Sequence, residues 1–214
     1  EWIVDLWIGQ FGQETTTAML QGLLQERPVT IRMRTEDEKA VEALRADLEK
    51  QGGTLKRHPY LSYAYVIEKT DDLTQLSGFQ EGAFVIQDIS SMLVAQTAAP
   101  KKGDYVIDVC AAPGGKSTHI AELLQGSGHV LARDLTDTKV GMIEENIERH
   151  GLNNMSAEMW DATVPDADSI GKADILICDL PCSGLGVLDR KKDIRYKMTP
   201  ESVDELVALQ RQIL

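Results

Sequence analysis

Hydrophobic residues in the second half of the chain form short, unbroken runs, separated by segments with helical spacing. The runs predict buried strands at residues 106–109, 129–134, 155–160 and 173–178. The spaced segments predict helices at residues 88–98 and 117–124, and one that ends at Gly151. Strands that alternate with helices in this way indicate a parallel, doubly wound α/β sheet of the Rossmann-like kind.

The chain before this region predicts two smaller parts. Residues 1–24 show helical spacing interrupted by one glycine, and we expect a helical linker segment there. The next part combines two strand-like runs with a helical stretch that begins at a capping-box pair, Thr35 and Glu38. We therefore expect a small α+β module at residues 25–78 and a larger domain at residues 79–214.

The distribution of charge limits how the chain can bind nucleic acid. The 214 residues carry a net charge of -12, which argues against RNA binding by bulk charge alone. Local basic positions remain, and within the small module they are Arg27, Arg32, Arg34, Lys56 and Arg57. Acidic residues nearly balance them, so a solvated surface is the alternative to an RNA contact. The most basic stretch of the chain lies at residues 185–197.

Composition also bears on compartment and ligands. Three cysteines without scaffold-like spacing indicate reduced thiols and a cytoplasmic protein. No apolar run has the length of a membrane-spanning helix, and no histidine has a partner at metal-ligand spacing, so we expect neither a membrane anchor nor a metal. The chain opens on Glu1 instead of Met and stops inside a helical pattern at Leu214, so we also expect a segment of a longer protein.

The sequence D-V-C-A-A-P-G-G-K at residues 108–116 joins a predicted strand to a predicted helix. This order brings helix and loop N–H groups together at the end of a sheet, where a nucleotide-like ligand can bind. Gly114 and Gly115 let the backbone approach the ligand without a Cβ atom, and Pro113 stiffens the turn. A triphosphate-binding P-loop is the alternative, but Cys110 stands where that loop needs its first glycine.

Four aspartates lie at or just after the predicted strands: Asp108, Asp134, Asp161 and Asp179. Because parallel strands end at one edge of a sheet, we expect these carboxylates on the same rim, with capping or turn formation as the alternative for each. A carboxylate at Asp134 can accept hydrogen bonds from both hydroxyls of an unmodified ribose. This arrangement favours S-adenosylmethionine or a dinucleotide over a triphosphate.

Asp179 opens a second motif, D-L-P-C-S-G at residues 179–184, which offers a carboxyl group and the thiol of Cys182 together. Methylation at C5 of a pyrimidine needs such a pair, because a thiolate must add at C6 before C5 becomes nucleophilic, and an acid must assist near N3. A small buried residue is the alternative for Cys182. We expect Cys110 and Cys178 to be packing residues.

Residues 108–116 and 179–187 together resemble the Sun-type, RsmB-like RNA cytosine C5 methyltransferases. The similarity runs from about Gln87 to Leu214, and the preceding residues resemble that family's small RRM-like module. The resemblance implies a class I methyltransferase domain with S-adenosylmethionine as cofactor and small-subunit ribosomal RNA as substrate. The implied cofactor-binding residues are Cys110, Ala111, Ala112, Pro113, Gly114, Gly115, Lys116, Asp134, Asp161 and Asp179.

The resemblance also implies a role for individual residues. Asp134 is expected to hold the ribose, Asp161 to reach the adenine end, and Asp179 to lie beside the target cytosine. Asp179 and Cys182 are the implied catalytic residues. One departure concerns the adenine contact, because Trp160 precedes Asp161 where the family usually has glycine.

A second departure concerns the nucleophile. The family uses two cysteines, and the attacking one lies in a Thr-Cys motif on a later strand that this sequence lacks. Cys182 then corresponds to the cysteine that assists release of methylated RNA, unless it attacks directly as in the DNA cytosine methyltransferases. We expect the chain to bind the cofactor with little turnover. Two other functions stay open, a P-loop nucleotide hydrolase with a Walker B-like run at residues 175–179, and a non-catalytic RNA-binding module.

Overall fold

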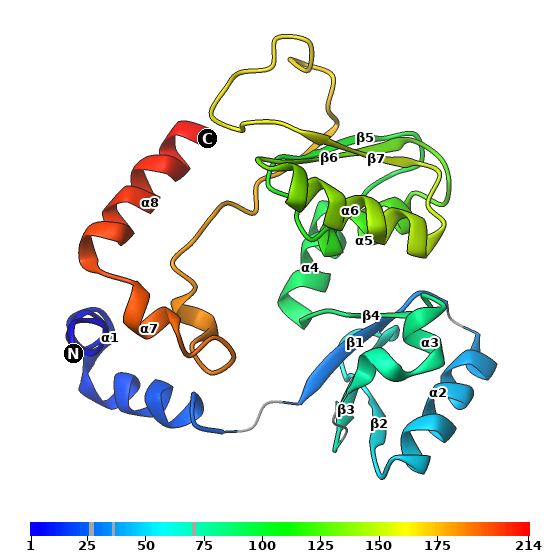
Figure 1. The fold of residues 1–214 in the computed structure, drawn as a ribbon, viewed down its shortest axis with the longest axis horizontal. Helices are drawn as coiled ribbons and strands as arrows, with labels where there is room; N and C mark the ends of the chain where they lie inside the picture. Colours follow the sequence, from blue (N-terminus) through cyan, green and yellow to red (C-terminus); the bar gives the residue numbers. More distant parts are fainter. Residues whose placement is uncertain (26–27, 36, 70–71) are drawn as a thin grey trace. The chain divides into compact units, whose positions relative to one another are not determined.

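The computed structural model describes residues 1–25, 28–35, 37–69 and 72–214. Arg27, one of the predicted basic contacts, lies outside the described residues. The chain divides into a central unit, residues 28–179, and a terminal unit made of residues 1–27 and 180–214 (Figure 1). Among the described residues, no helix combines the length and apolar character needed to cross a membrane.

The central unit begins with a four-stranded antiparallel sheet in the order β2-β3-β1-β4 (Figure 1). Its strands are β1 (Val29–Met33), β2 (Thr54–Arg57), β3 (Ala64–Glu68) and β4 (Phe84–Ile86). They are connected by α2 (Glu38–Lys50), the 3-10 turn η1 (Leu73–Gln75) and α3 (Ser77–Gln80). The chain order βαββαβ is that of ferredoxin-like folds. One face of the sheet packs on α2 around Ile31, Leu48 and Phe84.

This first sheet differs from the predicted module in its extent and in its helix cap. The sequence pattern does not predict β2 or β4, and the sheet continues past the predicted boundary at residue 78 because β4 pairs with β1. The predicted capping box is also wrong. Asp37 caps α2, since its carboxylate accepts a hydrogen bond from the Lys39 N–H group at 3.0 Å. The resemblance of this module to the family's small RRM-like module stays a prediction.

The second sheet has four parallel strands in the order β7-β6-β5-β8, which confirms the predicted α/β fold. Figure 1 labels β5, β6 and β7 of this sheet. The strands are β5 (Tyr105–Asp108), β6 (His129–Asp134), β7 (Met155–Met159) and β8 (Ile175–Ile177). The accompanying helices are α4 (Ile89–Ala98), α5 (Gly115–Leu123) and α6 (Asp137–His150). Fully buried Val106, Val130 and Ile143 belong to its core. Branched apolar residues on the central strands are what a sheet covered by helices requires.

The second face of the first sheet packs against helices of the parallel sheet. Ala64 of β3 is fully buried there with Met92 of α4. Arg32 is buried as well, and its guanidinium group and that of Arg34 both form ion pairs with Glu122 of α5. Arg32 is therefore neither an RNA contact nor a solvated surface residue. The remaining described members of that basic set also have acidic partners, Lys56 with Glu68 and Arg57 with Glu38.

The terminal unit is made of helices from both ends of the chain. Its elements are α1 (Trp2–Gly22), the 3-10 turn η2 (Leu185–Val187), α7 (Ile194–Lys197) and α8 (Pro200–Ile213). Gly12 breaks α1 with φ 77°, at the predicted glycine interruption. Thr199 caps α8, because its hydroxyl oxygen accepts a hydrogen bond from the Ser202 N–H group at 3.2 Å.

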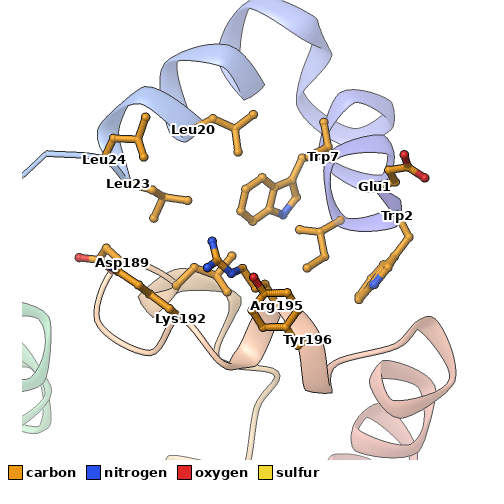
Figure 2. Close-up of a pocket in the computed structure, with 13 residues that line it drawn as sticks. Glu1, Trp2, Trp7, Leu20, Leu23, Leu24, Asp189, Lys192, Arg195 and Tyr196 are labelled. Atoms are coloured by element: carbon orange, nitrogen blue, oxygen red, sulfur yellow. The ribbon is translucent and has the colours of Figure 1, made fainter.

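A cavity of about 500 Å³ lies inside the terminal unit (Figure 2). Trp2, Trp7 and Leu20 line it from α1, on both sides of the break in that helix. Arg195 and Tyr196 of α7 line the other side, and the Arg195 guanidinium carbon lies 4.8 Å from the Tyr196 ring centroid. The apolar side of α1 therefore borders a cavity instead of a closed core.

Candidate active site

The glycine loop, residues 109–114, joins β5 to α5 at the carboxyl edge of the parallel sheet. The Ala111 N–H group donates to the Arg133 carbonyl at 2.9 Å, and the Gly114 N–H group donates to the Ala111 carbonyl at 2.7 Å. Gly114 has φ +102°, and a Cβ atom there would lie 3.5 Å from Ile143. Because side chains rarely adopt this φ, the loop conformation depends on glycine at this position.

The N-terminal end of α5 opens toward the same edge. An α-helix leaves the N–H groups of its first turn without intrahelical acceptors, and here these belong to Gly115, Lys116 and Ser117. The Ser117 hydroxyl donates to Asp108 Oδ2 at 2.6 Å. Burial raises the pKa of the Asp108 carboxyl group to about 6, although the hydrogen bond from Ser117 opposes that rise. Asp108 therefore supports the loop from inside the domain.

Asp134, the last residue of β6, is buried beside the glycine loop. Its Oδ2 accepts from the Ala112 N–H group at 2.9 Å. Its Oδ1 accepts from the Leu135 N–H group at 2.8 Å and from Lys139 Nζ at 2.9 Å. Burial alone would raise the pKa of Asp134, but these three hydrogen bonds hold it below its ordinary value. An ionised carboxylate keeps further acceptor positions, so Asp134 can also accept hydroxyl groups of a ligand.

The strand order reverses at β5. The chain adds β6 and β7 on one side of β5 and then crosses over to place β8 on the other. Ligands of such sheets bind outside the strand ends at this switch point. Lys116 from the start of α5 and Asp179 after β8 form an ion pair there, with Nζ and Oδ2 2.5 Å apart. The predicted residues 110–116, Asp134 and Asp179 therefore share one edge of the sheet.

Asp161 lies farther along this edge, just after β7. The main-chain N–H group of Trp160 donates to the Asp134 carbonyl at 2.9 Å, which keeps this segment beside β6. The Asp161 carboxylate accepts from the Thr163 hydroxyl at 2.7 Å and from the Thr163 N–H group at 2.9 Å. These hydrogen bonds lower the pKa of Asp161, so its exposed carboxylate is ionised at neutral pH.

The three cysteines differ in their surroundings. Cys110 is half-buried, and burial, together with the charges of Asp134 and Asp108, raises the pKa of its thiol to about 11. It is therefore protonated at neutral pH and a poor nucleophile. Cys178 is exposed just after β8, so its predicted buried position is wrong. Cys182 is also exposed and belongs to the terminal unit, whereas the glycine loop belongs to the central unit.

Three residues that contact the loop or its supports are not among the predicted site residues. They are Ser117, Lys139 and Gln87, whose Nε2 donates to the Gly115 carbonyl at 3.1 Å. A hydroxyl in the first turn of the helix is a signal that could have found Ser117. No local pattern connects Gln87 with a glycine 28 residues later. That contact depends on how the two sheets pack.

The parallel sheet, the glycine loop and the aspartates at its edge define a class I methyltransferase domain. Residues 95–214 match the family described as 16S rRNA methyltransferase RsmB/F. The chain belongs to this family, which confirms the resemblance found in the sequence.

Two relatives and one solved structure show how far the similarity extends. Probable ribosomal RNA small subunit methyltransferase B of Bacillus subtilis is 35% identical over 219 residues, covering 100% of this chain and 48% of the relative. The tRNA (cytosine(72)-C(5))-methyltransferase of Pyrococcus horikoshii is 42% identical over 120 residues, covering 56% of this chain and 30% of the relative. NSun6 from Pyrococcus horikoshii, solved with SFG, shares the fold at TM-score 0.85 and 23% identity, over 98% of this chain and 77% of that chain. The chain thus spans about half the length of the Bacillus relative.

Proposed function

We propose that this chain is the cofactor-binding part of an enzyme that transfers a methyl group from S-adenosylmethionine to C5 of cytosine in small-subunit ribosomal RNA. The observation that carries the proposal is the Lys116–Asp179 ion pair, because it joins the helix that follows the glycine loop to the first residue of the Asp-Leu-Pro-Cys motif at the switch point. Membership of the RsmB/F family supports the reaction class. The names of the relatives support an RNA substrate, ribosomal RNA for one and tRNA for the other.

The residues around the loop fit a nucleoside cofactor that ends in an amino-acid group. The free N–H groups of the first turn of α5 suit a carboxylate, and Asp134 suits two ribose hydroxyls. We assign the cofactor contacts to residues 110–116, with Asp134, Asp161 at the adenine end, and Asp179. When bound, S-adenosylmethionine supplies a methyl group activated by a positively charged sulfur.

Asp179 and Cys182 are the proposed catalytic residues. A carboxyl group at Asp179 would bind the cytosine ring at N3 and assist when a thiolate adds at C6. Cys182 is the proposed second cysteine, which helps to release the methylated RNA, with direct attack at C6 as its alternative role. Cys110 is unsuited to either role, because burial keeps its thiol protonated.

The structure does not favour a P-loop hydrolase. A phosphate cradle needs several inward-facing N–H groups, but those of Ala111, Ala112 and Gly114 already donate to acceptors within the protein. Pro113 has no N–H group to offer. Lys116, which would have to reach the phosphates, is paired with Asp179.

Calorimetric titration tests the cofactor assignment. We expect the chain to bind S-adenosylmethionine and S-adenosylhomocysteine and not Mg-ATP. Binding of neither methionine-derived ligand would refute the proposal, and stabilisation by Mg-ATP alone would favour the hydrolase. RNA binding without cofactor binding would instead indicate a non-catalytic RNA-binding module.

Labelled methyl groups test the reaction itself. Transfer to small-subunit ribosomal RNA but not to tRNA would support the proposed substrate, and the reverse would reassign it. We expect little turnover from this chain alone, because the Thr-Cys motif is not in its sequence. RNA that carries 5-fluorocytosine separates the two roles of Cys182. A covalent complex that Cys182→Ser abolishes would indicate direct attack by Cys182, and a complex that persists in Cys182→Ser would exclude it.

A further inference from the structure

Gln87 lies between the two sheets of the central unit and contacts both. It directly follows β4, and two hydrogen bonds fix its main chain to β1. The Gln87 N–H group donates to the Thr30 carbonyl at 3.1 Å, and the Thr30 hydroxyl donates to the Gln87 carbonyl at 2.7 Å. Gln87 is only 7% exposed. The first sheet therefore sets the position of a buried amide group that extends toward the second.

The hydrogen-bond partners allow this amide group one orientation. Arg32 Nε donates to Gln87 Oε1 at 2.8 Å, and Gln87 Nε2 donates to the Gly115 carbonyl at 3.1 Å. A guanidinium group can only donate and a carbonyl group can only accept. Reversal of the amide would set donor against donor and acceptor against acceptor. Arg32 thus directs the Gln87 N–H group at Gly115.

Arg32 is in turn held by the same helix. Its guanidinium group pairs with Glu122, near the end of α5, and that of Arg34 pairs with the same carboxylate. Between the two ends of α5, the His119 ring packs edge-on against the Tyr63 ring, with centroids 5.4 Å apart. One face of α5 is therefore docked on the first sheet at its start, its middle and its end.

We propose that Gln87 is a positioning residue for the methyl donor, which acts by holding the Gly115 carbonyl and with it the glycine loop and the first turn of α5. The inference rests on the proposed function, because it concerns the same loop. The Ser117 hydroxyl anchors this turn to Asp108, but Gly115 itself has no side chain, and Gly114 before it takes a left-handed conformation. An external hydrogen bond therefore limits how far the start of the helix can move. In this role the small module serves cofactor binding.

The substitution Gln87→Glu separates the two bonds of the amide group. A carboxylate still accepts from Arg32 but cannot donate to Gly115. Because one hydrogen bond is lost, we expect the affinity for S-adenosylmethionine to fall about fivefold. The affinity for RNA, measured in the same way, should stay unchanged. Gln87→Met, which removes both bonds, should weaken cofactor binding further.

Gln75→Glu is the matched control. The Gln75 amide is exposed on η1, which packs on the α2 side of the first sheet, and donates to Asp72 Oδ2 at 3.4 Å. This variant should bind the cofactor as the wild type does. Equal affinity in the wild type, Gln87→Glu and the control would overturn the positioning role and leave the proposed function intact. No cofactor binding by the wild type would refute the proposed function, and this inference with it.

A measurement on the unaltered protein covers the case in which both Gln87 variants unfold. In NMR spectra, the side-chain amide protons of Gln87 should exchange slowly with solvent, because the group is buried and bonded at both ends. Their signals should shift when S-adenosylmethionine is added. Fast exchange, or signals that do not respond to the bound cofactor, would overturn the proposal.

Discussion

Lys116 Nζ lies 2.5 Å from Asp179 Oδ2, and this ion pair joins two motifs that are 63 residues apart in the sequence. The pair exists because β8 lies directly beside β5, so the residues that follow these two strands meet at the same edge. It brings the Lys116 cation, in the first turn of α5, to the carboxylate proposed to contact the target base.

Asp179→Asn keeps the size of the side chain and removes its charge. We expect the low methyl transfer of this chain to fall about 100-fold or more, to background, as expected for loss of a group that takes part in proton transfer. The free energy of unfolding should change by less than about 1 kcal/mol, since the Asp179 side chain is 55% exposed. Asp193→Asn removes an exposed ion pair with Lys197 and is the control. Equal activity in both variants would exclude a catalytic role for Asp179.

Asp108→Asn should remove a pH dependence of stability. The pKa of Asp108 is about 6 in the folded protein and about 4 in an unfolded chain, so the folded state holds the proton more tightly. Stability is then greatest where the group is protonated and falls as pH rises from about 4 to about 6, by on the order of 3 kcal/mol. Urea unfolding at several pH values tests this. As pH rises from about 4 to about 6, the free energy of unfolding of the variant should increasingly exceed that of the wild type. A constant difference across that interval would contradict the prediction.

Gly114→Ala tests the left-handed turn in the loop. Alanine at φ +102° is expected to cost about 1 to 2 kcal/mol of stability and to weaken cofactor binding, because the loop must shift to relieve the strain. Gly141→Ala in α6 is the control, since a Cβ there would meet none of the described atoms within 4 Å and alanine favours a helix. Chemical denaturation and calorimetric titration measure the two effects. Equal stability and equal cofactor affinity of the two variants would show that the loop tolerates a side chain at position 114.

Glu122→Gln should be strongly destabilising. It leaves the guanidinium group of Arg32, whose side chain is 2% exposed, without its buried counter-charge, at a cost of about 3 kcal/mol or more. Glu42→Gln removes an exposed pair with Arg45 and should change stability by less than about 1 kcal/mol. Thermal and urea unfolding compare them. Similar small decreases in the free energy of unfolding of both variants would mean that the docking of α5 does not depend on the Glu122 charge.

Local patterns predict the parallel sheet and the edge where the site lies. The β5–loop–α5 unit combines a branched apolar run, two glycines and a helical segment within a few residues, and each signal is local. The positions of Asp108 and Asp134 can also be predicted from the apolar runs of β5 and β6, because each aspartate is the last residue of its strand. The structure places both at the expected edge.

Features that depend on distant contacts could not be predicted in this way. β4 is three residues long and is defined by its pairing with β1, and without it neither the extent of the first sheet nor the position of Gln87 can be inferred. Arg32 looks like a surface cation in the sequence, since Glu122 lies 90 residues away. Cys178 belongs to an apolar run, but β8 pairs only with β5 among the described strands and ends before that cysteine.

The strand order also has a consequence for the growing polypeptide. β5 needs β6 on one side and β8 on the other, but β8 is synthesised after β6, α6 and β7. The glycine loop therefore leaves the ribosome well before Asp179. The ion pair between Lys116 and Asp179 cannot form until Asp179 has been synthesised. Contacts between distant parts of a chain also form late because loop-closure entropy opposes them. Cofactor capture is thus expected only once residues 175–179 have emerged from the exit tunnel and β8 has paired with β5.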